Sequence, residues 1–345
     1  RKIKDGELAR RCLPPLTQFV QGTEKSLYKA AALAMIAHYQ AIDGAAAAAM
    51  AVADSIPSLK RGDFPGLNEG FYDSVKPVTY VKIAQCELKA GRRDVAAQTL
   101  DKAMKLCEAI VTPGERTVAE IMILDALMAC GRDEDARVLL KQAVPRALSL
   151  TEPRRSRSLA VLVASQAKLG DFDDARKTID AIRDYPGLEK MRGLHHLADA
   201  YEKRGDEARM KAALREELAA AGTKKPEEYG KGPMITINAF SATTYIDPDA
   251  DFNPGMAEHF RQMSLAHIHA RLGDLDGAKK SIEAQPAPNR PGATNALVSS
   301  LVSMGKVDQA LELVRTMDSF ENRLSAMQML ACMIRDRDRE TLKAR

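Results

Sequence analysis

The chain has 345 residues, a length that suits either two ordinary domains or one long array of repeats. Hydrophobic residues make up 45% and charged residues 28%, which is the composition of a folded chain and excludes a disordered one. The 51 basic and 47 acidic residues leave a net charge of +4, and no row of basic residues alternates with aromatics, so we expect no nucleic-acid partner. No apolar run approaches the roughly 18 residues of a membrane span.

The cysteines are odd in number, and no two of them have the CxxC spacing of a metal or redox motif. They are Cys12, Cys86, Cys107, Cys130 and Cys332. We interpret them as structural free thiols, which favours a reducing compartment such as the cytoplasm.

The first segment in chain order, residues 1–22, is expected to be irregular because the adjacent Pro14 and Pro15 disfavour a long helix. Its apolar side chains are expected to cover the open end of the first repeat as an N-terminal cap. Five helix pairs then fall within residues 23–222, and two more pairs with a C-terminal capping helix fall within residues 255–345. We expect the pairs at residues 23–55, 77–110, 113–150, 153–182, 188–221, 255–283 and 291–317, and the last helix at residues 320–335.

A glycine ends the first helix of every predicted pair. Glycine adopts the left-handed conformation that ends a helix, and an aspartate after it, as in Gly170-Asp171, can cap the next helix. Five residues after the glycine stands an alanine in six of the seven copies, and eight residues before it stands a large aliphatic residue in all seven. The turn glycines are Gly44, Gly91, Gly131, Gly170, Gly205, Gly273 and Gly305. The small residue lets two helices approach closely, and one pair cannot bury its apolar face alone, so the pairs must stack.

The stretch Leu197-Ala198-Asp199-Ala200-Tyr201-Glu202-Lys203-Arg204-Gly205-Asp206 resembles the tetratricopeptide-repeat (TPR) family in its Leu-Ala, Tyr and Gly-Asp elements. Leu265-Ala266 with Gly273-Asp274 forms a second such copy. The resemblance covers roughly residues 24–334 and implies an all-α solenoid of about seven TPR-like helix pairs with a terminal capping helix. The chain departs from the family pattern because it has no tryptophan and its turn glycines lie 47, 40, 39, 35, 68 and 32 residues apart, against a family repeat of about 34.

Residues 223–254 interrupt the array. They are rich in glycine, proline, threonine and aspartate, and residues 234–240 alternate like a strand. We expect a long non-helical insertion here. Two interpretations stay open: a surface excursion that packs across the groove, or a recognition or lid segment.

The resemblance also implies that first helices line a concave groove, with groove positions six, ten and thirteen residues before each turn glycine. Those positions are mostly apolar in the early copies and carry long polar or aromatic side chains in the later ones. The candidate groove residues are Arg157, Arg192, His195, Asp199, Phe260 and His267. Such side chains converging on a concave face suit peptide recognition, whereas the alternative is that they are solvated helix faces. The family's lysine-and-asparagine clamp for peptide carboxylates is not reproduced, so that ligand class is not expected.

Catalytic and metal-binding motifs are missing from the sequence. It contains no HExxH, no calcium loop, no phosphate-binding glycine loop and no GxSxG element, so we expect neither a cofactor nor a catalytic residue. A metal site built from His195, His259 and His267 on neighbouring repeats is the alternative.

These features predict a non-enzymatic interaction scaffold that holds a peptide or a partner protein in its groove, self-association included. One alternative is a small-molecule or enzymatic site walled by residues 223–254. Another follows from the start of the chain at Arg1 rather than at a methionine: the chain would be the solenoid module of a larger protein whose activity lies elsewhere.

Overall fold

The computed structural model describes residues 5–22, 27–57, 73–152, 154–183, 189–222, 254–317 and 319–343. The chain divides into two compact units: unit 1 holds the helices from α1 to α9, and unit 2 those from α10 to α16. Within the described ranges every regular element is helical, which confirms the all-α prediction. None of the helices described there is both long and apolar enough to cross a membrane.

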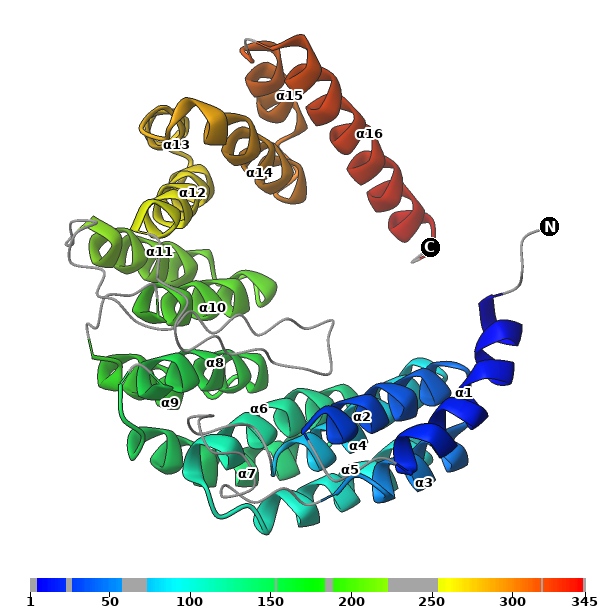
Figure 1. Ribbon diagram of the computed structural model, residues 1–345. Coiled ribbons are helices and arrows are strands. Elements are labelled where there is room, and N and C mark those ends of the chain that lie inside the picture. The colour runs from blue at the N-terminus through cyan, green and yellow to red at the C-terminus, as the bar shows by residue number, and fades with distance from the viewer. Residues whose placement is uncertain are drawn as a thin grey trace. The chain divides into compact units, whose positions relative to one another are not determined.

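The helices of unit 1 run as consecutive pairs in chain order (Figure 1). They are α1 (Asp5–Gln21), α2 (Leu27–Ile42), α3 (Ala46–Asp54), α4 (Val75–Lys89), α5 (Arg93–Glu108), α6 (Pro113–Cys130), α7 (Asp133–Leu148), α8 (Arg154–Leu169) and α9 (Phe172–Ala181). The first helices of successive pairs pack directly on one another, α2 on α4, α4 on α6 and α6 on α8.

Unit 2 continues the same pattern. Its helices are α10 (Glu189–Lys203), α11 (Glu207–Gly222), α12 (Pro254–Leu272), α13 (Leu275–Glu283), the 3₁₀ turn η3 (Ala287–Asn289), α14 (Arg290–Ser303), α15 (Val307–Arg315) and α16 (Phe320–Lys343). Here α12 packs on α14 and α14 on α16, and α12 also packs on the second helix α11. The last helix extends to Lys343, beyond its predicted end at residue 335.

The turn glycines behave as the sequence predicts. All seven have a positive φ, between 71° and 86°. At the end of α6, for example, the Gly131 N–H donates to the Met128 carbonyl at 3.1 Å and the Arg132 N–H donates to the Leu127 carbonyl at 2.9 Å. These bonds satisfy carbonyl groups that the helix end would otherwise leave free.

The predicted core positions are buried. The alanine five residues after the turn has no exposed surface in any of its six copies: Ala49, Ala96, Ala136, Ala175, Ala278 and Ala310. Of the aliphatic residues eight before the turn, only Leu265 on α12 is half-buried, and Ile268 takes the fully buried place on that helix. Close approach of paired helices through a small residue therefore holds in six of the seven pairs, and Met210 takes this position in the pair of α10 and α11.

Aspartate capping holds at two of the predicted turns and fails at a third. Asp206 accepts a hydrogen bond from the Arg209 N–H at 3.1 Å, and Asp274 accepts one from the Gly277 N–H at 2.9 Å. The Asp171 side chain makes no cap bond and instead accepts from Arg137 Nε at 3.2 Å. An arginine of the preceding pair competes successfully for that carboxylate because a charge-assisted bond is the stronger one.

The expectation of an irregular N-terminal segment is wrong for residues 5–21, which form α1 through both prolines. Each proline removes its own N–H bond from the helix, and its ring crowds the carbonyl four residues before it. The Thr17 hydroxyl donates to the Leu13 carbonyl at 2.7 Å, and Val20 is buried where α1 packs on α2. Tertiary packing therefore outweighs the local cost of the prolines. The predicted insertion, by contrast, lies outside the described residues but for Pro254 at the start of α12.

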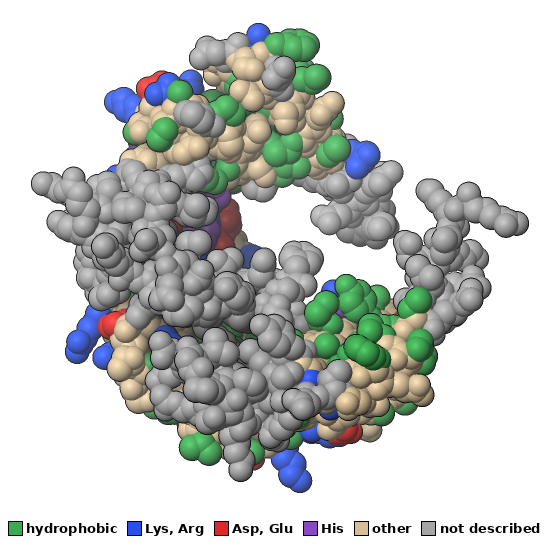
Figure 2. Space-filling view, viewed as in Figure 1, with side chains coloured by type: hydrophobic (Ala, Val, Ile, Leu, Met, Phe, Trp, Pro, Cys, Tyr) green, Lys and Arg blue, Asp and Glu red, His purple; other side chains and the backbone are tan. Residues whose placement is uncertain are grey.

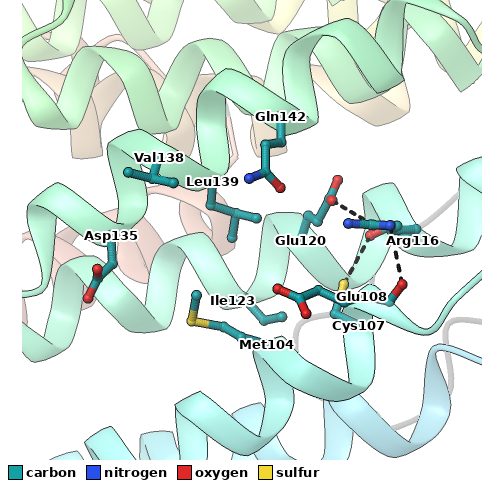
Figure 3. A pocket seen from close by; sticks show the side chains of 10 residues that line it. All are labelled: Met104, Cys107, Glu108, Arg116, Glu120, Ile123, Asp135, Val138, Leu139 and Gln142. Carbon is teal, nitrogen blue, oxygen red and sulfur yellow. Dashed lines mark hydrogen bonds and ion pairs between the residues drawn. The ribbon is translucent and has the colours of Figure 1, made fainter.

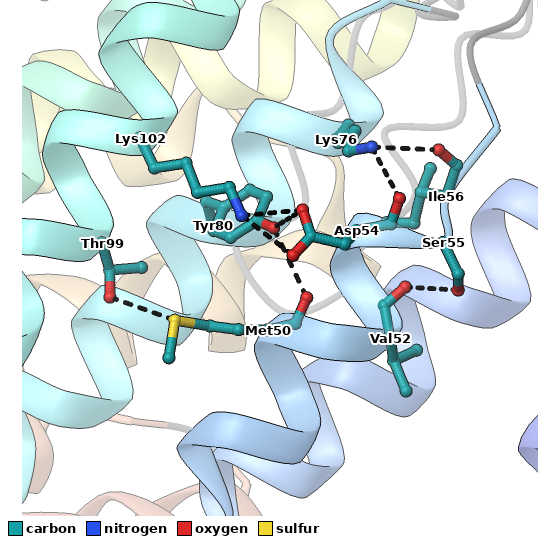
Figure 4. Close-up of polar contacts among 9 residues, drawn as sticks. All are labelled: Met50, Val52, Asp54, Ser55, Ile56, Lys76, Tyr80, Thr99 and Lys102. Carbon is teal, nitrogen blue, oxygen red and sulfur yellow. Dashed lines mark hydrogen bonds and ion pairs between the residues drawn. The ribbon is translucent and has the colours of Figure 1, made fainter.

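Two polar clusters join helices of unit 1, one between neighbouring repeats and one within a single repeat. In Figure 4, Asp54 accepts from the Tyr80 hydroxyl at 2.6 Å and from Lys102 Nζ at 2.7 Å, and burial with this carboxylate raises the pKa of Tyr80 to about 12. Buried Glu120 on α6 accepts from Arg116 Nε at 3.1 Å, as drawn in Figure 3, and from Arg146 Nε of α7 at 3.2 Å. The Asp54 side chain is exposed, whereas buried Glu120 meets two guanidinium donors, as a buried charge requires.

Candidate binding site in unit 2

The structure brings together three of the six predicted groove residues. His195 and Asp199 lie one turn apart on α10, and His267 of α12 reaches them, with the two imidazole rings 5.2 Å apart between centroids. Arg192 is exposed in the first turn of α10. Arg157 belongs to α8 in unit 1, and the Phe260 side chain lies outside the described part of the chain.

A buried carboxylate from the second helix completes the centre of this group. Glu217 of α11 is 3% exposed, and its Oε1 lies 3.4 Å from His195 Nδ1. The other oxygen, Oε2, is buried and has no hydrogen-bond partner. On the opposite edge of the ring, His195 Nε2 lies 3.7 Å from Asp199 Oδ2. The imidazole therefore stands between two carboxylates.

Arg271 at the end of α12 joins the cluster to α10. Its Nη1 donates to Asp199 Oδ1 at 2.7 Å and its Nη2 to Glu202 Oε2 at 2.8 Å. The arginine side chain is 3% exposed, whereas Asp199 and Glu202 are 38% and 48% exposed. The buried guanidinium of Arg271 is thus neutralised by the Asp199 and Glu202 carboxylates, which are themselves partly exposed to solvent.

His267 is also hydrogen-bonded to α14. Its Nδ1 lies 2.5 Å from Ser300 Oγ, and that hydroxyl lies 3.0 Å from the Ala296 carbonyl. The contact joins α12 to α14 beside the other polar groups.

We call this group of six residues the α10–α12 cluster. Its members are His195, Asp199, Glu202, Glu217, His267 and Arg271. Figure 2 shows histidine side chains beside acidic ones at a recessed part of the surface. The first helices of unit 1 contribute apolar residues to a common core, whereas here long polar side chains join α10 to α12.

Proton affinities in the cluster follow from its charges. Burial opposes the charged form of His195, but the Glu217 and Asp199 carboxylates outweigh it, so the pKa of His195 is raised above 6.5. Burial raises the pKa of Glu217 as well. Burial and the charges of His195 and Arg271 lower the pKa of His267 to about 4, so His267 is neutral at physiological pH.

Sequence inspection missed Glu202, Glu217 and Arg271, because it considered only three positions on each first helix. Glu202 and Arg271 stand three and two residues before their turn glycines. Glu217 was detectable: it continues the buried stripe of Met210, Ala213 and Leu214 on α11, where an apolar residue is expected. A charged residue on such a stripe is a signal of a buried polar site.

The alternative metal site includes His259, whose side chain lies outside the described part of the chain. Among the side chains that are described, no three His, Cys, Asp or Glu converge in a metal-binding arrangement. His269 on the same helix is engaged elsewhere, since its Nδ1 lies 2.8 Å from Asp274 Oδ2. Among the cysteines, Cys107 is buried and its pKa is raised to about 12 by burial and the nearby Glu120, which makes it an unreactive thiol.

No family model matches the chain, and no curated protein sequence matches it. Among solved structures, Ton1535 from Thermococcus onnurineus is 15% identical over 95% of this chain and 98% of its own, with a TM-score of 0.34. The TPR-like repeats of a putative kinesin light chain from Podosopora anserina are 16% identical over 74% and 96%, with a TM-score of 0.34. The apo quorum sensor NprR from B. thuringiensis is 12% identical over 94% and 83%, with a TM-score of 0.38.

The TPR-like character of this chain is established by its own turns and helix pairs. Positive-φ glycines end the first helices, buried alanines follow them, and helix pairs stack in chain order within each unit. The predicted degenerate α-solenoid is confirmed in these respects, and helical repeats of this kind form scaffolds for protein interaction.

Proposed function

We propose that this protein is an interaction scaffold that binds a peptide or an extended segment of a partner protein on the first-helix face of unit 2. The observation that carries the proposal is the convergence of His195, Asp199 and His267, from groove positions of two repeats, on one partly exposed polar cluster. Buried charged groups cost stability. Their retention here therefore favours a role in specificity or in binding a ligand.

The neighbouring helix α14 extends this surface. Asn295 stands ten residues and Ser299 six residues before Gly305, at the groove positions of the next repeat. Both are half-buried, and Asn295 Oδ1 is a buried acceptor without a hydrogen-bond partner. A peptide backbone laid across α12 and α14 supplies N–H donors for such an acceptor.

Selection from a random twelve-residue peptide library against the full chain tests the proposal. We expect selected peptides to protect α10, α12 and α14 from hydrogen exchange. We also expect Ser299→Arg, which fills the face of α14, to abolish binding. The matched control Gln85→Arg, at the same repeat position on α4 in unit 1, is expected to leave binding unchanged. Failure to select any peptide, or protection confined to the second helices, would refute the scaffold proposal.

The same cluster supports a second candidate, a small-molecule site with acid–base chemistry. The observation in its favour is the carboxylate–imidazole pair of Glu217 and His195, with both pKa values raised. A thermal-shift screen of metabolites against wild type and His195→Gln separates the two candidates, because a small-molecule site predicts a stabilising compound whose effect needs His195 and no selected peptide.

A further inference from the structure

The charges of the α10–α12 cluster are unbalanced. Three carboxylates come from Asp199 and Glu202 on α10 and from Glu217 on α11. The only permanent cation paired with them among the described residues is Arg271, and His267 is neutral. The titrating imidazole of His195 therefore supplies the remaining positive charge.

The uncommitted atoms of the cluster are acceptors. Glu217 Oε2 is buried and unpartnered, and Glu202 Oε1 is not used in the contacts described above. A guanidinium has five N–H donors and an ammonium has three, and either group could donate hydrogen bonds to these acceptor atoms. An anionic ligand would be repelled by the carboxylates. A carboxylate oxygen buried without a donor is costly, so its retention points to a donor that arrives with a ligand.

We propose that the cluster receives a cationic group of the bound partner, a lysine or arginine side chain or an N-terminal ammonium. This inference rests on the proposed scaffold function and names the chemistry of the ligand at that site. The exposed oxygens of Asp199 and Glu202 make the first contact, and Glu217 supplies the buried charge behind them.

His195 competes with the incoming cation. Its imidazolium lies between Glu217 and Asp199, which are the carboxylates that the ligand would use. The charged groups that face this ring are Asp199 from its own helix, Glu217 from α11, and Arg271 beside the neutral His267 from α12. Binding a cation among them lowers the proton affinity of His195, so binding releases a proton and strengthens as the pH rises from 6 to 8.

The test uses the peptides selected from the random library, resynthesised with each Lys or Arg replaced by norleucine and, separately, with an acetylated N-terminus. Removal of one cationic group is expected to weaken binding by about tenfold or more, since a charge-assisted hydrogen bond is lost. Side-chain replacement and acetylation distinguish the two sources of the cation.

Variants locate the effect. Glu217→Gln keeps the shape and removes the charge, so the fold is retained while affinity is expected to fall about tenfold and to lose its dependence on pH. Glu216→Gln, the exposed neighbour on α11, is the matched control and is expected to change nothing. The imidazole NMR signals of His195 are expected to titrate at lower pH in the complex.

The two proposals fail in different ways. If no peptide is selected, the scaffold function falls and the cationic site falls with it. If peptides bind to α10, α12 and α14 but tolerate norleucine, acetylation and Glu217→Gln, the scaffold stands and the cationic site is refuted. An affinity that is constant or falls between pH 6 and 8 also contradicts the cationic site.

Discussion

Unit 1 and unit 2 use the same repeat, but the junction between α10 and α12 in unit 2 differs from the junctions between first helices in unit 1. Ten residues before the turn glycine, unit 1 has only apolar residues: Ala34, Val81 and Ala160, which are buried, and Ile121, which is half-buried. Its first helices pack directly on one another. At the same position unit 2 has His195, half-buried, and α10 meets α12 through charged side chains. Close packing of apolar residues makes a rigid junction that offers a ligand few polar groups. Polar contacts between helices, in contrast, leave polar groups that a ligand can bind.

The buried carboxylates sharpen this difference. Glu120 in unit 1 has an arginine from its own helix and another from α7, so its charge is matched within the fold. Glu217 in unit 2 has one titrating histidine and an unpartnered oxygen. A matched charge is structural, and an unmatched one favours a site that a second molecule completes.

The largest contrast between the units is expected from truncating the aliphatic residue eight positions before the turn glycine. Ile123→Ala in unit 1 removes a fully buried side chain and should cost about 2–5 kcal/mol, since a cavity remains. Leu265→Ala in unit 2 removes a half-buried one and should cost less than about 2 kcal/mol. Hydrogen exchange of α6 and α12 measures each loss within its own unit, and equal losses would show that the two units pack alike.

An intermediate effect is expected from acidification of unit 2. Because the pKa of folded His267 is about 4 and that of the unfolded chain is about 6.5, the unfolded state binds more protons in this window. The stability that unit 2 gains from keeping His267 neutral is fully present above pH 6.5 and is lost as the pH falls toward 4. The loss in the free energy of unfolding is below about 3 kcal/mol. Exchange protection of α12 and α14 should therefore fall less steeply with acid in His267→Gln than in wild type. Parallel curves would show that the buried imidazole does not govern this response.

The smallest contrast concerns the residue five positions after the turn glycine. Ala175→Leu in unit 1 overpacks a site with no exposed surface and should destabilise by about 1–3 kcal/mol. Met210→Leu in unit 2 exchanges side chains of similar volume at the same position and should cost less than about 1.5 kcal/mol. Thermal unfolding followed by circular dichroism compares the two, and an unchanged Ala175→Leu variant would contradict close packing at this position.

Much of the candidate site could be predicted from the sequence, because the distance from the turn glycine sets the face on which a first-helix residue lies. That rule placed His195, Asp199 and His267 on one face, and the structure brings them together. It could not find Glu217, which comes from a second helix. Nor could it separate Arg157 from the others, since repeat position says nothing about which unit a helix joins.

The sequence by itself determined the repeat: glycines that tolerate positive φ end the first helices, and alanines five residues later set how closely the helices approach. These are local properties of the chain, so they can be read without a fold. Only the tertiary structure decided that α1 is helical through two prolines and that Arg271 reaches Asp199, 72 residues away in the chain. Those outcomes depend on the energy of packing between helices, which outweighs local preference and which no single segment of sequence contains.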